Sequence, residues 1–190
     1  MAEGMVDKAK DAVVGVVRGA GDVVDAVRGT VTDLVTNSLK GAGEVAGAAV
    51  GVVTDTVRGA IRGTRETGTE AAEGARAIVS GAVEAVGSVG ADLVQGARNA
   101  VKAAIEGAAE VGGDLGGTAV GAVQGAIDAA KKVGSNVTEV TRGAVEQAIS
   151  TAGSISKSAA DNVGKALSAV AEVPKDLLDS VTGKGKEKGG

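Results

Sequence analysis

The chain has 190 residues, enough for one domain, with 44% hydrophobic residues, a formal net charge of −4 and no Phe, Tyr, Trp, His or Cys. Without His and Cys the usual catalytic triads, thiol chemistry, disulfides and zinc sites cannot be built, so we expect no enzyme, no catalytic residue, no metal, no cofactor and no small-molecule substrate. Without aromatic side chains or a basic block, we expect no nucleic-acid binding.

Residues 1–8 form a charged N-terminal lead-in, and the apolar stretch VVGVV that follows shortly after is too short for a secretory signal. The longest uncharged run covers residues 115–127, which is shorter than the roughly 18 residues needed to cross a bilayer. We therefore expect a soluble, cytoplasmic protein, with a peripheral place at a membrane or granule surface as the alternative.

Residues 9–173 carry a 22-residue repeat, whose register extends without insertion or deletion to residue 184 as eight copies. The apolar positions recur every eleven residues, or about 3.67 residues per helical turn. This period predicts an all-α fold of long amphipathic hendecad helices, packed as a bundle, a helical hairpin or a straight to right-handed coiled assembly. A β-solenoid with coils of 22 residues is the rival interpretation.

The fifth and ninth positions of the repeat form the two most regular aliphatic columns. We expect these side chains to pack between helices or to face lipid: Val13, Val17, Val35, Leu39, Val57, Ile61, Val79, Val83, Val101, Ile105, Val123, Ile127, Val145 and Ile149.

Acidic and basic residues at positions ten and fourteen lie four apart, as in Arg18/Asp22, Lys40/Glu44, Arg62/Glu66 and Asp128/Lys132. Neighbours at this spacing predict ion pairs within one helix, on a solvated face.

Two glycine-rich or threonine-rich stretches, residues 63–70 and 111–117, interrupt the pattern. Because the register continues through both, we interpret them as bends rather than loops. The stretch VPKD predicts the end of the last helix near Val173, and residues 174–190 are expected to form a C-terminal cap and a disordered basic tail.

Glycine is concentrated at positions seven and eleven, which are four apart and form a strip of small residues beside the aliphatic columns. Such strips allow two helix backbones to approach closely. The glycines expected to do so are Gly15, Gly19, Gly59, Gly63, Gly81, Gly107, Gly121 and Gly125. A second set, Gly68, Gly90, Gly112 and Gly134, interrupts the aliphatic stripe at position sixteen.

Stretches such as VTDTVRGAIRGT and GAVEAVGSVGADLVQGA resemble the eleven-residue helical repeats of synucleins and perilipins, of group 3 late-embryogenesis-abundant proteins and of bacterial phasins. The likeness is one of period and composition and covers most of residues 9–173. The lipid-surface families imply an amphipathic helix that coats an apolar or anionic surface, and the stress family implies protection during drying.

A helix this rich in glycine is marginal alone in water and needs a surface to fold against. The sequence therefore predicts a non-enzymatic structural protein that self-associates, as a homo-oligomer or fibre, through its Val/Ile/Leu and Gly/Ala faces. Reversible binding to a lipid or storage-granule surface, and protection against desiccation, are the alternatives.

Overall fold

The computed structural model describes residues 2–19, 22–42 and 46–182. Within them the chain is helical and has no strand, which confirms the predicted all-α fold of packed helices. The helices are α1 (Ala2–Gly19), α2 (Val23–Ala42), α3 (Ala46–Glu66), α4 (Ala71–Ser88), α5 (Leu93–Glu110), α6 (Leu115–Val133), α7 (Val137–Ile155), α8 (Lys157–Leu167) and α9 (Lys175–Thr182).

A turn that recurs every 22 residues ends helices α3 to α6. Gly68, Gly90, Gly112 and Gly134 each have a positive φ, between 62° and 77°, a conformation that glycine adopts without steric cost. The residue after each glycine donates its backbone N–H to the carbonyl five residues earlier, as in Thr69 to Thr64 at 2.9 Å. This is the Schellman arrangement that satisfies the last carbonyls of a helix.

The N-cap of the next helix lies two residues after each of these glycines, at Glu70, Asp92, Asp114 and Asn136. The last three accept a backbone N–H of the new helix on their side-chain oxygens, whereas Glu70 makes no such bond. These caps satisfy N–H groups that have no partner inside a helix. One repeat is therefore one helix together with its turn.

This arrangement corrects the interpretation of the two interruptions as bends. Residues 67–70 and 111–114 are turns between separate antiparallel helices, and the same turn occurs at residues 89–92 and 134–136. The phase is kept because the turn is part of every repeat. The glycines at position sixteen therefore end helices and do not notch an aliphatic stripe inside one.

The N-terminal lead-in, for which the sequence predicts no particular structure, is helical from Ala2, and Val6 within it is buried. The C-terminal end differs from expectation. The last repeat helix ends at Leu167 rather than near Val173, and Pro174 precedes a further helix, α9. The predicted tail beyond residue 182 lies outside the described residues.

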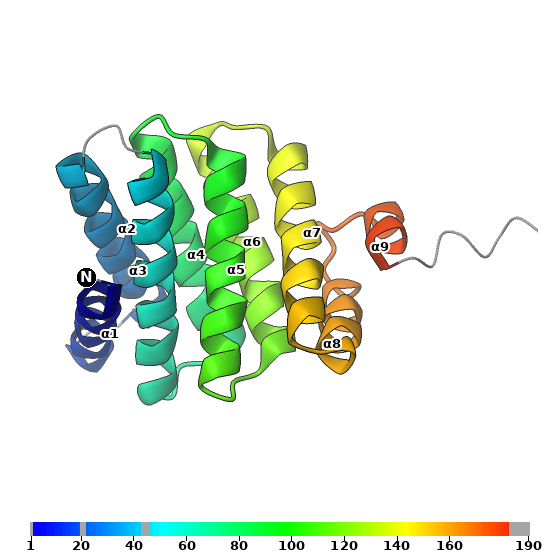
Figure 1. The fold of residues 1–190 in the computed structure, drawn as a ribbon, viewed down its shortest axis with the longest axis horizontal. Coiled ribbons are helices and arrows are strands. Elements are labelled where there is room, and N and C mark those ends of the chain that lie inside the picture. Colours follow the sequence, from blue (N-terminus) through cyan, green and yellow to red (C-terminus); the bar gives the residue numbers. More distant parts are fainter. Residues whose placement is uncertain (1, 20–21, 43–45, 183–190) are drawn as a thin grey trace, which may run out of the picture.

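The helices form two layers because each turn reverses the chain. The closest packing joins each helix to the second one along, so α1, α3, α5 and α7 form one layer and α2, α4, α6 and α8 the other. Figure 1 shows α3, α5 and α7 side by side, with α4 and α6 behind them. Neighbours within a layer are therefore parallel, and neighbours across the layers are antiparallel.

The core lies between the layers and contains only aliphatic and small side chains. Ile78, Ile105, Ile127 and Leu167 are among the largest side chains that are fully buried. Buried Ala residues separate them, such as Ala100 and others along α5 and α6. Because no aromatic ring fills the space, the helices approach closely. Glycines lie at the points of closest approach.

Candidate functional site

No group of three or more acidic residues among the described residues is arranged to hold a metal ion. None of the described helices is long and apolar enough to cross a bilayer.

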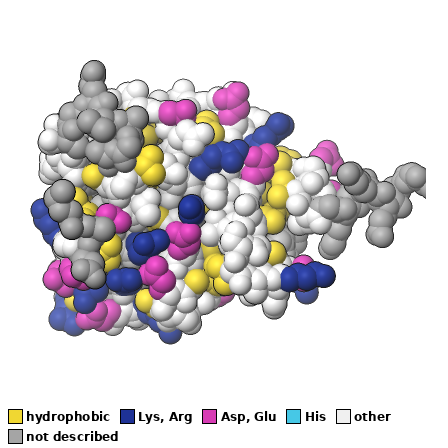
Figure 2. All heavy atoms as spheres, viewed as in Figure 1, with side chains coloured by type: hydrophobic (Ala, Val, Ile, Leu, Met, Phe, Trp, Pro, Cys, Tyr) yellow, Lys and Arg dark blue, Asp and Glu magenta, His cyan; other side chains and the backbone are white. Residues whose placement is uncertain are grey.

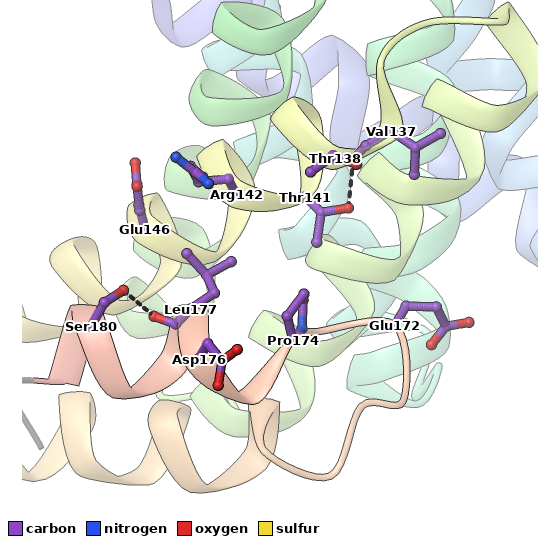
Figure 3. A pocket seen from close by; sticks show the side chains of 10 residues that line it. All are labelled: Val137, Thr138, Thr141, Arg142, Glu146, Glu172, Pro174, Asp176, Leu177 and Ser180. Carbon is purple, nitrogen blue, oxygen red and sulfur yellow. Dashed lines mark hydrogen bonds between the residues drawn. The ribbon is translucent and has the colours of Figure 1, made fainter. Parts of the chain in front are cut away.

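A hollow of about 440 Å³ lies between the N-terminal half of α7 and α9 with the segment that precedes it. Figure 3 shows that the hydroxyls of Thr141 and Ser180 are turned to carbonyls of their own helices, Val137 and Leu177, at 2.7 Å each. Glu146, also in the lining, accepts from Arg98 of α5. These three polar groups are therefore hydrogen-bonded within the helix bundle.

The most distinctive feature of the molecule is the strip of glycines at repeat positions seven and eleven. In the interior helices these glycines contact the backbone of the neighbouring helix in the same layer. A Cβ on Gly63 of α3 would lie 2.9 Å from the Lys10 carbonyl oxygen of α1. One on Gly81 of α4 would lie 2.5 Å from the Arg28 carbonyl oxygen of α2. Real Cβ atoms do not come this close, so only glycine permits the observed separation of the backbones.

The same contact recurs between later helices. A Cβ on Gly121 or Gly125 of α6 would overlap the carbonyl oxygen of Ala72 or Arg76 in α4, and one on Gly59 of α3 would overlap that of Val6 in α1. At Gly107 of α5 the fit is looser, with 3.4 Å to the Cα of Arg58. In each case the glycine belongs to the later helix and meets the backbone of the helix two before it.

Ion pairs cross the same helix pairs on the solvent side. Arg58 of α3 binds Glu106 of α5 at 2.9 Å, and Arg62 binds Glu110 at 2.7 Å. The predicted pairing of Arg62 with Glu66 inside one helix is therefore wrong. On the face seen in Figure 2, acidic and basic side chains lie next to one another rather than in patches of one sign.

The predicted pair of Asp128 and Lys132 is likewise divided between two partners in α4. Asp128 accepts from Arg76 at 2.7 Å, and Lys132 binds Glu84 at 2.6 Å. The hydrogen bond to Asp128 raises the pKa of the Arg76 guanidinium above its ordinary value. Arg18 and Asp22 form no ion pair with each other among the described residues, and the side chain of Glu44 lies outside them.

The first two helices present this glycine strip to solvent. Gly15 of α1 and Asn37 of α2 are exposed, whereas their counterparts at position seven of α3 to α6 are buried: Gly59, Gly81, Ala103 and Gly125. Gly41 is exposed in the same way, whereas Gly63, Ala85, Gly107 and Ala129 at position eleven are buried. We call this surface the N-terminal edge: Gly4, Lys8, Asp11 and Gly15 of α1, with Asp33, Asn37 and Gly41 of α2.

The glycines of the first helices have no neighbour within the described chain that accounts for them. Five helical glycines have no described atom within 4 Å of a Cβ position, and all lie in α1 to α3: Gly4, Gly15, Gly29, Gly41 and Gly51. Each costs its helix about 1 kcal/mol relative to alanine, and no contact among the described residues offsets that cost.

A short helix packs against the opposite end of the bundle. Figure 1 shows α9 beyond α7 and α8, and it contacts both. Val170, Val173 and Leu178, which lead into α9 and lie in it, are buried and join the hydrophobic core. An amphipathic segment thus packs against the C-terminal end, and the two ends of the helix array differ in this respect.

The structure places the predicted packing residues as follows. Thirteen of the fourteen aliphatic residues are buried, and Val17 is half-buried against the core. Of the predicted close-approach glycines, Gly59, Gly63, Gly81, Gly107, Gly121 and Gly125 meet another helix. Gly15 does not, because it lies on the exposed edge, and the surroundings of Gly19 lie outside the described residues.

Sequence reasoning missed the turns and the ion pairs between helices. The signal for the turns is a glycine followed two residues later by Glu, Asp or Asn, at intervals of 22 residues. The signal for the ion pairs is an opposite charge 48 residues away, as in Arg58 with Glu106. Neither a family model nor a curated protein sequence matches this chain.

Proposed function

We propose that this protein is a non-enzymatic structural protein whose copies associate through the N-terminal edge. The observation that carries the proposal is that Gly15 and Gly41 are exposed at repeat positions that are buried in the interior helices. A second copy of this chain can supply the helix backbone that such glycines contact elsewhere in the molecule.

Glycine inside a helix lowers the stability of that helix but allows a second backbone to approach closely. An exposed mid-helix glycine destabilises its helix and gives no packing in return. Between α4 and α6 the same residue type allows the backbone of Ala72 to lie where a Cβ would be. Association at the edge gives Gly15 the role that Gly121 has inside the bundle.

A protein partner fits better than a lipid surface. The aliphatic columns that would enter a membrane, from Val13 to Ile149, lie almost entirely in the core between the two layers. Binding of these residues to lipid would require the core to open, with loss of the free energy gained by burying them there. The N-terminal edge, by contrast, is polar apart from its glycines, which suits a second folded chain.

The experiment compares two bulky, uncharged substitutions at exposed glycines. Gly15→Gln introduces a side chain at the N-terminal edge. Gly51→Gln introduces the same side chain on α3, a helix whose glycine strip already contacts α1. Both changes improve helix propensity, so neither threatens folding. The measurement is sedimentation velocity over a range of concentrations, with helicity checked by circular dichroism.

We expect the wild-type chain and Gly51→Gln to sediment as an oligomer, and Gly15→Gln to dissociate at concentrations at which they do not. A wild-type chain that stays monomeric at every concentration contradicts the proposal. So does a Gly15→Gln variant that associates as tightly as the wild type.

A further inference from the structure

We infer that two copies pair through α1 in antiparallel orientation, about a two-fold axis at Gly15, and that Asp11 of each copy meets Arg18 of the other. This inference rests on the proposed self-association and specifies its partner and geometry. It would make the assembly a closed dimer rather than a fibre.

Two charged residues of α1 lie on the same flank of Gly15. At about 100° per residue, Asp11 precedes Gly15 by roughly one turn and lies about 40° round the helix from it. Arg18 follows by nearly one turn and lies about 60° round in the same sense. The two charges therefore flank the glycine on the same side, at similar distances before and after it.

A two-fold axis through Gly15 pairs these charges between two copies. An axis perpendicular to α1 at Gly15 reverses the helix direction and keeps the flank, so Asp11 comes beside Arg18 of the second copy, and the pair occurs twice. An axis along the helix would instead place like residues at the same height but on opposite flanks of the contact, so neither ion pair would form. Charge complementarity therefore favours the antiparallel arrangement, because only this arrangement brings Asp11 of one copy beside Arg18 of the other.

These charges are available for new partners. Asp11 and Arg18 are exposed. Among the described residues, Asp11 has only Lys10 nearby, at 3.9 Å, and Arg18 forms no ion pair. On the interior helices, charges flanking a glycine contact are paired across the helices, as Arg76 is with Asp128 beside Gly125. The dimer would repeat that combination of glycine contact and flanking ion pairs.

The two ends of the array differ. A head-to-tail contact needs an N-terminal edge and an open C-terminal end, and it generates rings or filaments. Here α9 packs against the C-terminal end, with Leu178 buried. Pairing of two N-terminal edges uses the edge of each copy and therefore stops at two copies.

The test reverses the two charges separately and then mixes the variants. Asp11→Arg alone brings two arginines together at each contact of the dimer, and Arg18→Asp alone brings two aspartates together. We expect each change to weaken self-association by about tenfold or more, because both ion pairs become repulsive.

An equimolar mixture of the two variants restores the charge pairing. In the heterodimer, each contact joins an arginine of the Asp11→Arg chain to an aspartate of the Arg18→Asp chain, so we expect association close to wild-type affinity. Asp161→Arg, an exposed charge reversal on α8, serves as the control and should dimerise normally.

A second readout uses the absence of cysteine from the chain. Gly15→Cys should form a disulfide-linked dimer on mild oxidation, since the axis brings the two positions together, whereas Gly51→Cys should not.

The outcomes separate the two proposals. A wild-type chain that is monomeric overturns both. A wild-type oligomer that Gly15→Gln dissociates, but in which the mixture of charge variants fails to recover association, overturns the antiparallel pairing alone. Species larger than a dimer also overturn the pairing and leave self-association standing.

Discussion

The contact between α4 and α6 leads to a prediction in which one substitution has opposite effects at two glycines. Gly121→Ala adds a methyl group where the carbonyl of Ala72 already lies. Gly51→Ala adds the same group to a helix surface with no described atom within 4 Å. Both glycines lie inside helices, so the change in helix propensity is the same, and the difference measures the helix contact.

The expected magnitudes follow from these surroundings. Alanine in place of glycine stabilises a helix by about 1 kcal/mol, and this is the whole effect expected at Gly51. At Gly121 the obstacle is backbone, which cannot rotate away, so α6 must move off α4. Overpacking of this kind costs about 3 kcal/mol. We therefore expect Gly121→Ala to lose about 2 kcal/mol of unfolding free energy, some 3 kcal/mol below Gly51→Ala.

Urea unfolding followed by far-ultraviolet circular dichroism measures both free energies. The reasoning would be refuted by a Gly121→Ala protein as stable as Gly51→Ala, because the backbones would then not lie as close as the structure places them. Loss of stability in Gly51→Ala would show instead that another segment covers that face of α3.

Three further predictions concern turns, a buried hydroxyl and helix caps. Gly112→Ala should cost about 1–2 kcal/mol despite open space around it, because its φ is +62°, and an asparagine there should cost less; urea unfolding checks both. Thr56→Val should raise the unfolding free energy by about 1 kcal/mol, because the Thr56 hydroxyl is buried without a partner among the described residues, and a lower midpoint would contradict this. Asp92→Ala should lose about 1 kcal/mol with its two cap bonds, whereas Glu70→Ala, which removes none, should leave the thermal midpoint almost unchanged.

The helical class and much of the core could be predicted from periodicity, because burial recurs at fixed positions of the repeat. Val57, Val79 and Val101 are buried as their column predicted. The length of each helix could not be predicted in the same way. A turn that recurs at the repeat period leaves the phase unchanged, so a continuous helix and a chain of short ones give the same columns. Only the conformational demand of residues such as Gly112 distinguishes them.

The partners of the charged residues could not be predicted either, because they depend on the arrangement of the helices. Arg62 has Glu66 one turn away in its own helix, yet it binds Glu110 of α5. Neighbouring parallel helices bring residues 48 apart to the same height, and this offset becomes visible only when the two-layer order is known. The exposed edge has the same origin: Gly15 differs from Gly59 in what lies beside its helix, not in its place in the repeat.

The turn within each 22-residue unit also limits how such an array can be lengthened. One additional unit would reverse the direction of every later helix and move each of them to the other layer. Two additional units restore both, so 44 residues is the smallest insertion that leaves the downstream geometry unchanged. Variants designed to extend or shorten the protein should therefore be cut in helical hairpins, from one Gly-x-Glu/Asp/Asn turn to the next but one.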